Sequence, residues 1–194
     1  MKKLLITAAL TVVTVASALA QGRVSFNNTA FGTNIITVGT QNMGAAGGTA
    51  GSGIAVGTYS VQLVWAPDAV YGSQAAFDAA VIGSSNPLAI NAAPGIFAAG
   101  AVPNPTGTSM PGGTYQMQVR AWYNNATYAT YAAAYAAGVN TGLSPLFTQV
   151  ATVSPTTAPT TFFAAFTVGV VPEPSSLALA GLGAAALLVF RRRK

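Results

Sequence analysis

Regular alternation of apolar and polar residues predicts two long strands in the middle of the chain. Apolar residues stand at every second position from Tyr59 to Trp65, and again from Tyr115 to Ala121. A period of two is typical of a strand that has one face in a hydrophobic core. The second strand follows the turn-forming residues Pro111-Gly112-Gly113, so its start is well marked.

Shorter runs of β-branched and aromatic residues, separated by clusters of glycine, proline and small polar residues, predict five more strands. These are Val24–Asn27, Ile35–Val38, Gly95–Ala98, Leu146–Val153 and Phe162–Val168. About seven short strands with turn signals between them favour an antiparallel β-sandwich. The glycine-rich stretch Gly39–Gly53 and the proline-containing stretch Ala101–Gly113 are predicted to be loops.

Two segments depart from the strand pattern and predict short helices. Asp68–Val81 would begin with Asp68 as N-cap, although Gly72 is a potential interruption. Ala126–Ala137 is rich in alanine and is followed by Gly138, a typical residue just past a helix end. Three tyrosines at helical spacing in this second segment are expected to pack against the domain, namely Tyr128, Tyr131 and Tyr135.

The N-terminus has the layout of a secretory signal peptide. Lys2 and Lys3 precede an apolar run, Leu4–Val15, and small residues follow at Ala18 and Ala20. We expect a signal peptide over residues 1–20, removed by signal peptidase in front of Gln21. An uncleaved N-terminal helix is the alternative.

The C-terminus has three parts in a fixed order. Pro172, Glu173 and Pro174 are followed by the apolar run Leu177–Phe190 and then by four cations, Arg191, Arg192, Arg193 and Lys194. The cations are expected on the cytoplasmic side of the inner membrane, with all preceding residues exported. The apolar run is short against the about 20 residues of a full span, which favours a processed signal over a lasting anchor. An ordinary membrane anchor or a buried hairpin helix is the alternative.

This C-terminal arrangement resembles the PEP-CTERM sorting signal of exported bacterial proteins. The resemblance covers residues 171–194 and rests on Pro172-Glu173-Pro174, the apolar run and the basic end together. It implies recognition by exosortase, a membrane-embedded protease, with cleavage near the Pro-Glu-Pro and delivery to the cell surface or extracellular matrix. It also implies that residues 21–170 form the exported domain.

Charge is nearly absent between the two ends. The formal net charge of +5 comes from Lys2, Lys3, the four terminal cations and Glu173. Residues 21–171 contain only Arg23, Arg120, Asp68 and Asp78 as charged side chains. This excludes a nucleic-acid partner, which requires clustered lysine or arginine. The chain has no cysteine, so the exported domain must be held together by its core.

Candidate chemistry is limited by the same composition. With no histidine or cysteine and only Asp68 and Asp78 as exported carboxylates, we expect no enzyme activity, no metal site and no cofactor. The leading hypothesis is a non-catalytic exported protein of the cell surface or extracellular matrix. The alternative is a carbohydrate-binding module of the matrix, in which exposed faces of Trp65 and Trp122 stack on sugar rings of an extracellular polysaccharide.

Overall fold

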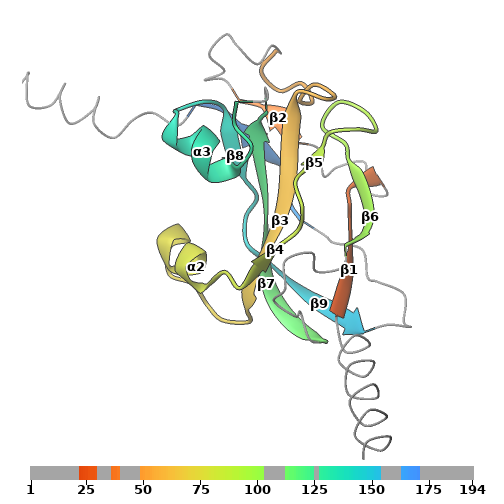
Figure 1. Ribbon diagram of the computed structural model, residues 1–194, viewed down its shortest axis with the longest axis vertical. Helices are drawn as coiled ribbons and strands as arrows, with labels where there is room; N and C mark the ends of the chain where they lie inside the picture. Colours follow the sequence, from red (N-terminus) through yellow and green to blue (C-terminus); the bar gives the residue numbers. More distant parts are fainter. Residues whose placement is uncertain are drawn as a thin grey trace, which may run out of the picture.

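The structure of the protein, a computed structural model, describes residues 22–29, 36–39, 49–102, 112–124, 127–153 and 163–170. Within these ranges the chain is mainly β, with two short helices (Figure 1). The elements are β1 (Gly22–Asn27), β2 (Ile36–Val38), β3 (Tyr59–Pro67), α2 (Gln74–Ala80), β4 (Gly83–Ser84), β5 (Leu88–Ala89), β6 (Ala98–Val102), β7 (Gly113–Tyr123), α3 (Tyr131–Ala136), β8 (Thr141–Leu143), β9 (Phe147–Val153) and β10 (Phe166–Val168).

Eight of the strands form one antiparallel sheet. Its order is β4-β3-β7-β9-β1-β6, with β5 also paired to β3 and β8 also paired to β7. The two long predicted strands lie side by side at its centre, with Tyr59 opposite Tyr123 and Pro67 opposite Tyr115. β2 and β10 form a separate parallel pair. The mainly β, antiparallel character is therefore confirmed.

The alternation in the sequence marks the inner face of the sheet. Apolar side chains of β3 and β7 on this face are buried, and β1, β2 and β10 add side chains to the same core. The pair Leu63 and Val119 lies at the middle of this face, and both residues are fully buried. The outer face of β3 and β7 is covered by α2 and α3 (Figure 1). A second apolar cluster lies there, made by Val64, Ala66 and Phe77.

Two strands beside the central pair are each broken by a serine. Between β4 and β5, Ser85 donates its backbone N–H to Leu63 O at 2.7 Å and accepts the Leu63 N–H on its Oγ at 2.9 Å. Between β8 and β9, Ser144 does the same with Val119, at 2.9 Å for both bonds. The register shifts by one residue at each break, which makes each a β-bulge. At each bulge the serine hydroxyl accepts the N–H of the opposite strand, in place of the backbone carbonyl that the bulge moves out of reach.

The sequence prediction missed β4, β5 and β8. These strands have only two or three residues, too few to show a period of two. The strand predicted over Gly95–Ala98 was also misplaced. Gly95 has φ 73°, and the strand begins at Ala98.

Both helices exist but start later than predicted. The N-cap of α2 is Ser73, whose hydroxyl accepts the Ala76 N–H at 3.2 Å. The assignment of Asp68 as N-cap was wrong. α3 begins after the N-cap Thr130, and its predicted end is confirmed, because Gly138 has φ 67° and closes the last turn.

The last described strand is tied firmly to the domain. Val168 O accepts the Gly39 N–H at 2.7 Å, and Gly169 exchanges two backbone bonds of 3.0 Å with Thr141. A Cβ on Gly142 would collide with Thr167 O, so β8 and β10 are in close backbone contact. Val170 ends the described part, directly before the predicted sorting signal.

Both predicted targeting segments lie outside the described residues. They are the signal peptide with Ala18, Ala20 and Gln21, and the C-terminal signal with Pro172, Glu173, Pro174, Leu177–Phe190 and Arg191–Lys194. Neither α2 nor α3 has the length and hydrophobicity of a membrane span.

Candidate functional site

The two tryptophans predicted to stack on sugars are buried. Trp65 belongs to the inner core and Trp122 lies on the outer face of β7, and both are 0% exposed. The Trp122 indole donates its Nε1 hydrogen to Tyr128 O at 2.9 Å, which fixes it inside the domain. The sugar-stacking prediction is wrong for both residues, because neither ring has a face at the surface. Their strands place these large side chains in core positions.

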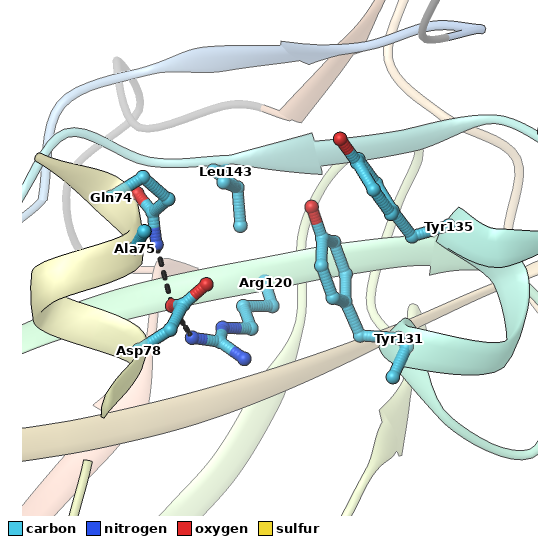
Figure 2. A pocket seen from close by; sticks show the side chains of 8 residues that line it. Gln74, Ala75, Asp78, Arg120, Tyr131, Tyr135 and Leu143 are labelled. Carbon is cyan, nitrogen blue, oxygen red and sulfur yellow. Dashed lines mark hydrogen bonds and ion pairs between the residues drawn. The ribbon is translucent and has the colours of Figure 1, made fainter. Parts of the chain in front are cut away.

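A surface pocket of about 440 Å³ lies on the outer face, between the two helices. Gln74, Ala75 and Asp78 line it from α2, and Tyr131 and Tyr135 line it from α3. Arg120 of β7 and Leu143 of β8 form the base between them (Figure 2). Elements far apart in the sequence therefore meet at one site, which is why no local motif revealed it.

A chain of polar contacts holds the α2 side of the pocket. Gln118, which is 2% exposed, and Gln74 exchange amide hydrogen bonds of 2.8 and 3.0 Å. Gln74 also donates to Asp78 Oδ1 at 2.8 Å. The Gln118 amide donates in addition to Ser144 O at 3.2 Å, so the chain begins at the β8–β9 bulge. The Asp78 carboxylate is thus fixed relative to the sheet.

Asp78 also pairs with the one arginine at the base of the pocket. Arg120 Nη2 contacts Asp78 Oδ1 at 2.5 Å (Figure 2). The Arg120 side chain is 16% exposed, whereas that of Asp78 is 48% exposed. The pair is therefore neutral as a unit, but its carboxylate is the part that faces the solvent in the pocket.

The α3 side of the pocket is aromatic. The Tyr131 and Tyr135 rings are stacked with centroids 6.1 Å apart, and Arg120 lies over the Tyr131 ring at 5.4 Å. Burial raises the pKa of the Tyr131 phenol, and the neighbouring Thr141 and Arg120 oppose part of that rise. The phenol is therefore neutral at physiological pH, and half of Tyr135 is exposed to solvent.

The two aspartates of residues 21–171 make different contacts. Asp68 accepts a hydrogen bond from Gln116 at 3.1 Å, whereas Asp78 accepts from Gln74 and Arg120. In the described ranges, no three acidic, histidine or cysteine residues gather as a metal site would require. The pocket offers one oriented carboxylate, one phenol-rich wall and a base in which the Arg120 guanidinium lies beside the apolar Leu143.

Sequence reasoning singled out neither Gln74 nor Arg120 for the site, and it assigned Tyr131 and Tyr135 to packing. The signal was present in the spacing of the tyrosines, which placed both on one helical face. The sequence could not show that the tyrosine face of α3 lies opposite α2, with β7 between the two helices.

Comparison with known proteins identifies one segment of the chain. Residues 170–194 match the family model of the PEP-CTERM protein-sorting motif. No curated protein and no solved structure matches the chain. The match confirms the resemblance of the C-terminus, and it indicates an exported protein that is sorted in dependence on exosortase.

Proposed function

We propose that residues 21–170 form a non-catalytic domain displayed at the cell surface or in the extracellular matrix. The observation that carries this proposal is the sorting-motif match at residues 170–194, which begins two residues after the last described strand ends at Val168. In this proposal signal peptidase removes residues 1–20 and exosortase cleaves near Pro172-Glu173-Pro174. The inner membrane holds the precursor through Leu177–Phe190 until that cleavage.

The contacts of the aspartates support a non-catalytic role. Glycoside hydrolysis and related acid–base chemistry use two carboxyl groups that face one bond. Asp68 and Asp78 instead bind different partners, Gln116 for the first and Gln74 with Arg120 for the second. A chain whose few ionisable groups serve structural contacts fits a surface component better than an enzyme.

The weak charge of the exported region supports association with other surface material. Its four charged side chains cancel, so the domain repels copies of itself only weakly. Val56, Val70, Ile82 and Val150 are large apolar side chains that are exposed in the described part. Both features favour retention in a matrix.

The test is to compare the location of the native protein with that of a variant in which Pro172, Glu173 and Pro174 are replaced by alanine. We expect the native protein at the surface or in the medium and the variant in the inner-membrane fraction. Ser176→Ala is the matched control, because it lies in the same segment outside the Pro-Glu-Pro. Release of the triple variant at the native level, or retention of the native protein inside the cell, would contradict the proposal.

A further inference from the structure

The pocket between α2 and α3 combines features that its structural role does not require. Its carboxylate is held by Gln74 and Arg120 and still has a side chain that is 48% exposed. Its aromatic wall ends in Tyr135, which is 50% exposed although most aromatic side chains of the domain are buried. We propose that this pocket binds a neutral sugar ring of a polysaccharide, with the wall of Tyr131 and Tyr135 as the apolar platform and Asp78 as the acceptor for sugar hydroxyls.

The charges around the pocket favour a neutral ligand. Arg120 is the pocket's cation, and Asp78 already neutralises it at 2.5 Å. An anionic ligand would meet the exposed carboxylate, and a cationic ligand would compete with the guanidinium for it. A ligand that donates hydroxyl hydrogens to the carboxylate avoids both costs, and such charge-assisted bonds are stronger than neutral ones.

The aromatic wall favours a ligand with an apolar face. Arg120, Tyr131 and Tyr135 form a continuous stack, with 5.4 Å from the guanidinium to the first ring and 6.1 Å between the rings. The contact with Tyr131 restricts the Tyr135 ring before any ligand arrives, so less side-chain freedom is lost on binding. The C–H bonds on one face of a pyranose carry partial positive charge, which suits the negative face of an aromatic ring.

The size of the pocket agrees with this class of ligand. Its volume of about 440 Å³ falls within the range of about 300–1,000 Å³ that is typical of small-molecule sites. Leu143 and Ala75 give the pocket an apolar part, and the Asp78 carboxylate and the tyrosine hydroxyls lie around it. A sugar ring has the same division between an apolar face and hydroxyl edges.

The inference deepens the proposed function, on which it rests for the presence of polysaccharide around the protein. The test uses the purified full chain in a detergent without a sugar head group, because glucoside or maltoside detergents would occupy the same site. Cellotriose, maltotriose and laminaritriose are titrated, and binding is followed by saturation-transfer NMR from the aromatic protons. Tri-galacturonate serves as the acidic comparison.

We expect at least one neutral trisaccharide to bind. Tyr135→Ala should weaken it about two- to twelvefold, the range expected for loss of one aromatic contact. Asp78→Asn should weaken it about tenfold, because a charged acceptor becomes neutral. The matched control is Tyr128→Ala, a tyrosine just ahead of α3 that does not line the pocket. Far-UV circular dichroism shows whether each variant is folded.

Three results would overturn the inference. The first is no binding of any neutral trisaccharide up to about 10 mM, a limit set well above the millimolar scale of weak ligands. The others are equal binding by the native chain and both pocket variants, and a preference for tri-galacturonate. None of these results affects cell-surface location, which is measured separately. Conversely, sugar binding by a protein that stays inside the cell would contradict only the proposed function.

Discussion

Replacing either bulge serine, Ser85 or Ser144, by alanine should destabilise the domain, because one buried backbone N–H loses its hydrogen-bond acceptor. In Ser144→Ala, the Val119 N–H loses the hydroxyl that accepts it at 2.9 Å. In Ser85→Ala, the Leu63 N–H loses its acceptor, also at 2.9 Å. Val119 and Leu63 are 0% exposed and the serines 3% or less, so water has no route to either N–H.

The expected cost follows from that burial. A buried donor without a partner costs about 1–3 kcal/mol of the free energy of unfolding. For a domain of this size, each kcal/mol corresponds to about 2–4 °C in the midpoint of thermal unfolding. The two serines lie on opposite sides of the central strand pair, about three strand spacings or 14 Å apart. Their effects should therefore add to within about 0.5 kcal/mol.

The assay is urea unfolding followed by the fluorescence of Trp65 and Trp122, which are both buried. The dependence of the unfolding free energy on urea should stay constant while the midpoint falls. Ser84→Ala is the matched control, because the neighbouring Ser84 hydroxyl meets only the Gln62 side chain, which also bonds Ser85 O at 2.7 Å. If the bulge variants lose no more stability than this control, the hydroxyls do not complete the sheet.

Three further predictions follow from packing, ionisation and the chain end. Gly83→Ala should lower the free energy of unfolding by about 1–3 kcal/mol, because its Cβ would lie 2.5 Å from Trp65 Cζ2. In a double-mutant cycle of urea midpoints, Trp65→Phe should partly rescue this loss. A loss that Trp65→Phe leaves unchanged would refute the clash. Burial raises the pKa of the Tyr59, Tyr115 and Tyr131 phenols above 10.0. The unfolded chain therefore releases these protons first, so stability is full below pH 10 and falls as pH rises above it; urea midpoints that are equal at pH 9 and pH 11 would contradict this. Finally, a chain that stops before β10 should lose its cooperative unfolding transition and become sensitive to protease, whereas one that stops after Val170 should keep both properties of the folded domain.

The sequence was sufficient for the centre of the fold. β3 and β7 follow directly from an alternation of apolar residues, because one face is buried from Tyr59 to Trp65 in β3 and from Tyr115 to Ala121 in β7. The end of α3 follows from Gly138, whose φ of 67° other residues adopt only with strain. These features depend on local chemistry, which a single sequence contains.

The remaining features depend on contacts across the fold. The breaks at Ser85 and Ser144 are defined by the strand opposite each of them, so no local period reports them. The sequence does not distinguish Trp65 and Trp122 from exposed aromatic residues. They are buried because the inner core covers one face of β3 and β7 and the helices cover the other. The pocket is hidden for the same reason, because Asp78, Arg120 and Tyr135 come from three separate elements.

The intact mass of the protein recovered from its native cells tests the sorted, exported state most directly, because it fixes both ends of the mature chain at once. We expect a chain that starts at Gln21 and ends between Pro172 and Ser176, found at the surface or in the medium. A mass that runs through Lys194 would mean that the C-terminal segment stays attached. The domain would then belong to a membrane-anchored protein, and the proposed release by exosortase would be wrong.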